Sequence, residues 1–116
     1  MTLDEFRKEM EAYRDFVQQE ATSLKDSYLA LDRLHGLYRK FDAQERAMAD
    51  QVLIEWALSE DENLRFDALA LIDDFRIAKA MPALKALAGR LASSRAPGAP
   101  YELQKVDRIL RDLGHG

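Results

Sequence analysis

Apolar side chains recur every three or four residues along most of this chain, which is the spacing of one face of an α-helix. At the N-terminal end, Thr2 and Glu5 have the spacing of a capping box, in which each side chain bonds to the backbone of the other residue. The stripe that follows consists of Leu3, Phe6, Met10, Tyr13 and Val17, widened by Phe16. The pattern predicts a first helix that ends where polar residues return at 18–20.

A second stripe predicts a second helix, capped by one of the two hydroxyl side chains at residues 22–23. Its apolar residues are Leu24, Tyr28, Leu31, Leu34, Tyr38 and Phe41. Gly36 interrupts this stripe and costs a helix about 1 kcal/mol relative to alanine. A close helix crossing or a kink would explain its presence.

A third helix is predicted at about 43–58, after the capping pair Asp42 and Glu45. Its apolar residues fall on two sides, with Met48, Val52, Leu53 and Trp56 on one and Ala47, Ile54 and Leu58 on the other. A helix with two apolar sides is expected to be covered on both of them. Trp56 shares its stripe with other apolar residues, so we predict that it lies in the core rather than on an interface.

A fourth helix is predicted at about 64–76, capped by Asp61 or Asn63. Its apolar residues are Leu64, Ala68, Leu71, Ile72 and Phe75. A fifth helix is predicted to start near Ala80, because Pro82 is tolerated in a first turn. Its stripe consists of Leu84, Leu87 and Leu91.

Residues 93–100 contain Ser, Pro and Gly in the pattern of a linker, and a sixth helix is predicted after them. Its apolar residues are Tyr101, Leu103, Val106, Ile109, Leu110 and Leu113. Gly114 has the position of the glycine that often ends a helix in a left-handed conformation. Because Val and Ile are scarce while Ala, Leu, Glu, Arg and Lys dominate, the sequence predicts an all-α protein of about six helices.

The second half of the chain repeats itself loosely. Trp56 stands 35 residues before Leu91, and Leu71 stands 38 residues before Ile109. Helix pairs with such a period are typical of an α-solenoid. The prediction is therefore a short solenoid of three antiparallel helix pairs.

Residues at about 43–113 resemble HEAT repeats. Leu64-Arg65, followed by Ala68 and Leu71-Ile72, is similar to the second helix of such a repeat, and residues 80–84 are similar to the proline-containing first helix of the next. The resemblance implies two HEAT-like repeats over 42–113, with residues 1–41 as an N-terminal capping helical hairpin. It also implies that an acidic turn, here Asp61, helps to order the loop before Arg65.

Two residues depart from the HEAT pattern. Ser59 stands six positions before Arg65, where the pattern has an acid, and the last repeat has an enlarged loop and no corresponding arginine. HEAT proteins include scaffolds and inhibitors as well as enzymes, so the resemblance does not select a function.

The amino-acid composition excludes several classes of protein. The 116 residues, 47% of them hydrophobic, are enough for one domain with a buried core, and the absence of Cys excludes disulfides and thiolate metal sites. No run reaches the ~18 apolar residues of a membrane-spanning helix, and the acidic start lacks the pattern of a secretory signal. We expect a single cytoplasmic domain over 1–116, a monomer or a homodimer, with no membrane segment and no cofactor.

No catalytic motif is recognisable: the chain has no P-loop, dinucleotide-binding glycine motif, nucleophile elbow or His-Glu-x-x-His. His35 borders an apolar stripe and is predicted to be interfacial and hydrogen-bonded, whereas His115 lies in a tail expected to fray. The neighbouring Asp73 and Asp74 do not face each other on a helix, which argues against a catalytic pair. We therefore predict that the protein is not an enzyme.

The acidic loop before the fourth helix raises the question of a metal site. Glu60, Asp61 and Glu62 are adjacent, so their side chains point in different directions, and the loop lacks the alternating oxygens and central glycine of an EF-hand. We predict that these carboxylates are solvated and cap the helix, with no bound metal.

Charge is strongly segregated along the chain. Residues 42–74 carry ten acidic and two basic side chains, whereas residues 75–116 carry eight basic and three acidic ones. Such segregation affects partners and association rates more than it affects the fold. Two interpretations remain open: the acidic segment binds a basic partner, or its outward Asp67 and Asp74 meet Lys105, Arg108 or Arg111 of the sixth helix.

Three functions remain open. The first is a protein-binding module, in its sharpest form an acidic immunity-type protein that neutralises a bacterial toxin with a basic surface. The second is a structural or adaptor role. The third is nucleic-acid binding, which the pI of about 5.2 opposes; it would use Lys79, Lys85, Arg90, Arg95, Lys105, Arg108 and Arg111.

For the first function, the fourth helix and the loop before it supply the predicted contact surface. Its residues are Glu60, Asp61, Glu62, Phe66, Asp67, Asp73 and Asp74. Phe66 lies off the apolar stripe, so it either packs against a neighbouring helix or provides an exposed apolar anchor.

Overall fold

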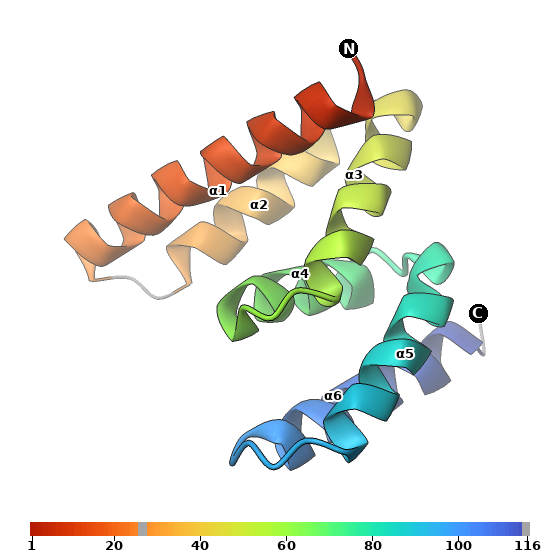
Figure 1. Ribbon diagram of the computed structural model, residues 1–116. Coiled ribbons are helices and arrows are strands. Elements are labelled where there is room, and N and C mark those ends of the chain that lie inside the picture. Colours follow the sequence, from red (N-terminus) through yellow and green to blue (C-terminus); the bar gives the residue numbers. More distant parts are fainter. Residues whose placement is uncertain (26–27, 115–116) are drawn as a thin grey trace. The chain divides into compact units, whose positions relative to one another are not determined.

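The computed structural model describes residues 1–25 and 28–114, and all regular structure in them is helical (Figure 1). The described elements are α1 (Leu3–Leu24), α2 (Leu29–Lys40), α3 (Ala43–Ala57), α4 (Glu62–Asp74), the 3₁₀ helix η1 (Ala78–Ala80), α5 (Met81–Ala92) and α6 (Ala99–Gly114). The prediction of an all-α protein with about six helices is confirmed. The predicted frayed tail at His115 lies outside the described residues.

The chain forms two units, unit 1 (Met1–Val52) and unit 2 (Leu53–Gly116). The boundary between them falls inside α3. The predicted single domain, with a capping hairpin over 1–41 and two repeats over 42–113, stays a prediction. The stacking of helix pairs into a solenoid stays a prediction.

In unit 1, α1 and α2 run side by side in opposite directions (Figure 1). The predicted capping box is present at the start of α1, where the Glu5 backbone N–H donates to Thr2 Oγ1 at 3.2 Å and the Thr2 N–H donates to Glu5 Oε1 at 3.2 Å. Further along, Val17, Ala21 and Ala30 form a buried cluster. Burial of the two apolar stripes holds the hairpin together.

The predicted cap of the second helix at residues 22–23 is wrong, because α1 continues through both of them to Leu24. Thr22 Oγ1 donates to the Gln18 carbonyl at 3.0 Å within α1 instead of capping a new helix. The helix ends at Lys25, whose φ of 55° is left-handed. Three side chains that the sequence placed in the apolar stripes are exposed: Phe16, Leu24 and Tyr28.

Aromatic side chains pack together at the other end of the hairpin. The rings of Phe6 and Phe41 lie 5.1 Å apart, and the Arg46 guanidinium lies 5.4 Å from the centre of the Tyr38 ring. The Tyr38 hydroxyl donates to Asp50 Oδ1 at 2.7 Å. Burial, together with this bond to a carboxylate, raises the pKa of Tyr38, so the hydroxyl remains a donor at neutral pH.

α3 begins at the second predicted capping pair, in which the Glu45 N–H donates to Asp42 Oδ1 at 2.8 Å. Its buried residues are Ala49, Val52, Leu53, Trp56 and Ala57. They lie on one face. On the predicted second side, Ile54 is half-buried whereas Ala47 and Leu58 are exposed, so this side is not fully covered. The predicted core position of Trp56 is confirmed, since its side chain is 4% exposed.

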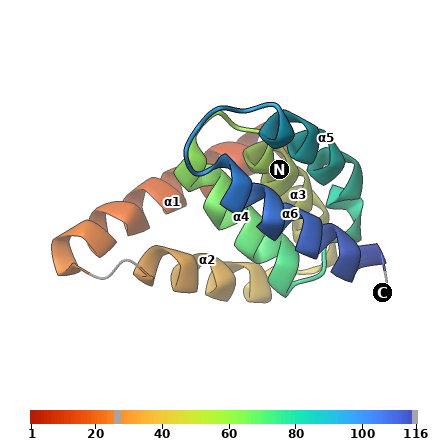
Figure 2. The ribbon, with the colours of Figure 1, turned by 90° about the horizontal axis from the view of Figure 1, so that it is seen from below.

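In unit 2, α5 and α6 run side by side in opposite directions (Figure 2). Pro82 lies in the first turn of α5, as predicted. Large side chains from α4, α5 and α6 are fully buried, among them Leu71, Ile72, Leu84, Leu87, Val106 and Ile109. Within the described residues, no helix is long and apolar enough to cross a membrane.

Two glycines differ from their predicted roles. A Cβ added at Gly36 would meet no described atom within 4 Å, so the helix crossing proposed for it is not present among the described residues. Gly114 is the last residue of α6 and does not adopt the positive φ predicted for it.

Candidate protein-binding surface

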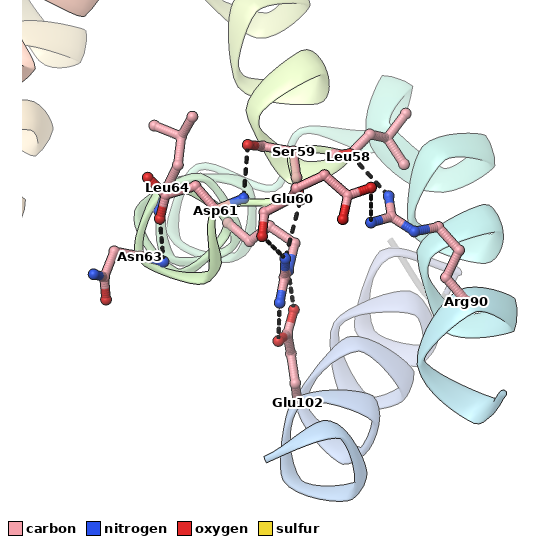
Figure 3. Close-up of polar contacts among 9 residues, drawn as sticks. Leu58, Ser59, Glu60, Asp61, Asn63, Leu64, Arg90 and Glu102 are labelled. Carbon is pink, nitrogen blue, oxygen red and sulfur yellow. Dashed lines mark hydrogen bonds and ion pairs between the residues drawn. The ribbon is translucent and has the colours of Figure 1, made fainter. Parts of the chain in front are cut away.

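The loop between α3 and α4 is ordered by its own polar groups. Asp61 caps α4, as predicted: its Oδ1 accepts from the backbone N–H groups of Asn63 at 2.9 Å and Leu64 at 3.3 Å (Figure 3). The Ser59 hydroxyl oxygen in turn accepts from the Asp61 N–H at 3.0 Å. The Asp61 carboxylate is therefore part of the fold as well as of the predicted contact surface.

Arg65 ties this loop to α6. Its Nη1 donates to the carbonyl oxygens of Ser59 at 3.0 Å and Glu60 at 3.1 Å. Its Nε and Nη2 donate to the two Glu102 carboxylate oxygens at 2.7 and 2.9 Å, the paired geometry that makes arginine–carboxylate contacts strong (Figure 3). The two side chains are only 12% and 14% exposed, and the Glu102 contact raises the pKa of Arg65, which keeps it charged.

A second arginine holds the same loop from α5. Arg90 Nη1 donates to the Leu58 carbonyl at 2.8 Å, and Arg90 Nη2 lies 3.6 Å from Glu60 Oε1 (Figure 3). The Glu60 side chain is 99% exposed, so this ion pair contributes little to stability. Glu60 remains accessible to a partner.

Asp61 helps to order the loop before Arg65, as the HEAT resemblance implies. The contacts of Arg65 itself are made elsewhere. Its acidic partner is Glu102, from α6, while Asp61 caps α4. The Ser59 carbonyl, at the position where the pattern has an acid, accepts from Arg65 through the backbone. The loop is ordered both by the Asp61 cap and by the arginine bonds to its carbonyls.

Asp67 does not point outward as predicted. It is 5% exposed and is a buried charged residue of unit 2. The reason is its place on the helix: Asp67 lies three residues after Leu64 and four before the buried Leu71, and therefore at the edge of the inward face. Asp67 is thus removed from the surface available to a partner.

Asp73 is engaged by α6. Arg108 Nη2 donates to Asp73 Oδ2 at 3.0 Å, and Arg108 Nη1 donates to Asp112 Oδ2 at 3.2 Å. The alternative in which acids of the fourth helix meet basic residues of the sixth is therefore realised at Asp73, a residue that the sequence predicts to bind a partner. Asp74 is exposed.

The N-terminal halves of α4 and α6 enclose a groove of about 320 Å³, the α4–α6 groove. Its lining residues are Glu62, Asn63, Phe66, Leu69, Gly98, Tyr101, Glu102 and Lys105. Two of them, Glu62 and Phe66, belong to the predicted contact surface. The groove therefore places a predicted apolar anchor beside a predicted carboxylate.

Two aromatic side chains that line this groove are accessible. Phe66 is 50% exposed and Tyr101 is 77% exposed. Phe66 is both packed and accessible, since the Lys105 ammonium lies 4.2 Å from the centre of its ring. Partial burial lowers the pKa of Lys105, against the opposing effect of Asp73.

Sequence reasoning missed three of these residues, although each carried a signal. The sequence analysis places Tyr101 in the apolar stripe, but on a helix of 3.6 residues per turn it lies about 140° from the buried Val106 and about 80° from the buried Ile109, to one side of the inward face. Glu102 stands four residues before Val106, so it lies on the inward face, where a charge requires a partner. Lys105 follows Tyr101 by four residues and shares its side of the helix.

The remaining polar candidates are His35 and the possible metal ligands. His35 is half-buried, and its Nδ1 lies 2.8 Å from the Leu31 carbonyl, in agreement with the predicted hydrogen-bonded position. Among residues 1–25 and 28–114, no three His, Asp or Glu side chains are grouped so that they could hold a metal ion.

The arrangement is that of an all-α protein with an exposed aromatic groove bordered by carboxylates. No protein-family model matches the chain, and neither a curated protein nor a solved structure matches it. The HEAT resemblance therefore stays a prediction, and function is argued from the groove.

Proposed function

We propose that the chain is a non-catalytic protein-binding module whose α4–α6 groove receives a basic segment of a partner protein. The observation that carries the proposal is the exposure of Phe66 and Tyr101 next to the carboxylate of Glu62. Aromatic side chains are frequent hot spots of protein interfaces, and complementary charge raises association rates and specificity. A basic segment that also carries apolar side chains fits this combination.

The proposed surface is narrower than the one predicted from the sequence. Asp61, Asp67 and Asp73 serve the fold, as a helix cap, a buried charge and an ion-pair partner. Of the predicted residues, the proposed surface keeps Glu60, Glu62 and Phe66, joined by Tyr101 and Asn63 of the groove.

In its sharpest form, the proposal is a cytoplasmic immunity-type inhibitor that covers the basic cleft of a toxin enzyme. The formal charge of −4 supports this form, because an acidic inhibitor is steered toward a basic cleft by long-range attraction. The attraction falls with salt, since ions screen charges beyond about 8–10 Å at physiological ionic strength.

Removing the aromatic anchors should weaken binding without affecting the fold. With the partner purified after affinity capture, calorimetric titration should show that Phe66→Ala and Tyr101→Ala each reduce affinity about 30-fold, the effect of losing about 2 kcal/mol at a hot spot. Phe16→Ala, which removes an exposed aromatic residue of unit 1, serves as the matched control and should bind like the parent. Parent-like binding by both groove variants would refute the proposed function.

A further inference from the structure

The α4–α6 groove already contains a cation. The Lys105 ammonium lies 4.2 Å from the centre of the Phe66 ring, which is the geometry of a cation–π contact. The carboxylates of Glu62 and Glu102 line the same groove, and Glu102 is held by Arg65. The Phe66 ring thus forms a seat for a positive charge that the protein fills with its own side chain, and Glu62 lines the same groove.

Lys105 is a weak occupant of this seat. Its ammonium is partly desolvated, and within the described parts of the chain it has no ion pair with a carboxylate. A cation–π contact at an accessible site contributes roughly 0.5–1 kcal/mol. A flexible lysine side chain can therefore leave the ring and return to water at small cost.

We propose that the α4–α6 groove is the seat of an arginine side chain of the partner protein, and that Lys105 occupies the Phe66 ring as an internal competitor in the free protein. This inference rests on the proposed function, because it names the side chain that the basic segment inserts. Binding then requires that Lys105 leaves the ring, so the apparent affinity is reduced by the fraction of molecules in which the seat is filled.

Arginine fits the seat better than lysine does. Its planar guanidinium stacks on aromatic rings and bonds a carboxylate through two N–H groups, and it is less strongly hydrated than an ammonium. Here the rings are those of Phe66 and Tyr101, and the carboxylate is that of Glu62. Gly98 lies close to this carboxylate, since a Cβ added at Gly98 would be in ordinary contact with Glu62 Oε1 at 3.6 Å.

The variant Lys105→Met tests the inference, because it keeps an unbranched apolar side chain and removes the charge. Lys85→Met, on the exposed side of α5, is the matched control that makes the same change in net charge. The probe is the peptide acetyl-Gly-Leu-Arg-Leu-Gly-amide, with lysine and glutamate versions, titrated into labelled protein while the NMR shifts of Phe66 and Tyr101 are followed.

We expect Lys105→Met to bind the arginine peptide about fivefold more tightly than the parent does, with the lysine peptide weaker and the glutamate peptide not bound. Lys85→Met should bind like the parent. An unchanged or weaker affinity in Lys105→Met would overturn the internal competitor. If the parent binds the glutamate peptide and Lys105→Met does not, the groove is an anion site and the arginine seat is wrong.

These outcomes separate the inference from the proposed function. If Lys105→Met fails to tighten peptide binding while Phe66→Ala still weakens the partner protein, only the inference falls. If no arginine peptide shifts the groove resonances in either protein and Phe66→Ala binds the partner normally, both fall.

Discussion

Replacing Arg65 with alanine should lower the free energy of unfolding by about 3 kcal/mol, the range expected when one member of a largely buried ion pair is removed. The loss combines two bonds to Glu102 with two bonds to loop carbonyls. It also leaves the Glu102 carboxylate, 14% exposed, without its arginine. Chemical denaturation followed by circular dichroism measures this loss.

The matched control is Arg90→Ala, because Arg90 bonds the same loop from a more exposed position. Its cost should be about 1 kcal/mol, close to that of a single exposed hydrogen bond or ion pair. A double-mutant cycle of Arg65→Ala with Glu102→Ala should show a coupling free energy above about 1 kcal/mol. Equal costs for the two arginine variants, with no coupling to Glu102, would contradict the role assigned to Arg65.

Reversing the charge of Asp67 should lower the free energy of unfolding at least as much as Arg65→Ala does. Asp67→Lys places a longer, cationic side chain at a position that is 5% exposed. A buried charge without a partner is costly, so we expect the free energy of unfolding to fall by more than about 3 kcal/mol and the Tm to fall markedly. Thermal unfolding measured by calorimetry gives the result directly.

Asp74→Lys is the control for this prediction, since it makes the same change seven residues later on an exposed part of α4. Its effect on stability should stay within about 1 kcal/mol, as for exposed charges generally. Similar Tm values for Asp67→Lys and Asp74→Lys would show that Asp67 is accessible after all, and would return it to the contact surface.

Much of the fold follows from local patterns that need no tertiary information. The capping pairs at Thr2 and Asp42 and the cap at Asp61 were predicted because a short polar side chain precedes each apolar stripe. The predicted start of the second helix was wrong, because a threonine hydroxyl can also donate to a carbonyl in the preceding turn of its own helix, as Thr22 does to Gln18. Sequence alone does not distinguish these two uses.

The candidate site was predicted less well, because its residues come from helices far apart in the sequence. The negative charge of residues 42–74 indicated an acidic surface, but it did not show that Asp73 pairs with Arg108, 35 residues later. Phe66 was singled out because it lies off the apolar stripe, and its 50% exposure agrees with that analysis. The groove itself depends on Tyr101 and Lys105, whose approach to Phe66 is a tertiary contact.

The most direct test of the central claim is to map the partner's footprint on the isotope-labelled chain by NMR. The account predicts that the largest shift changes occur at the α4–α6 groove and the loop before it, at residues such as Glu62, Phe66 and Tyr101, and that they shrink as salt is added. Changes confined to α1 and α2, with the groove resonances unmoved by a partner that binds tightly, would contradict it.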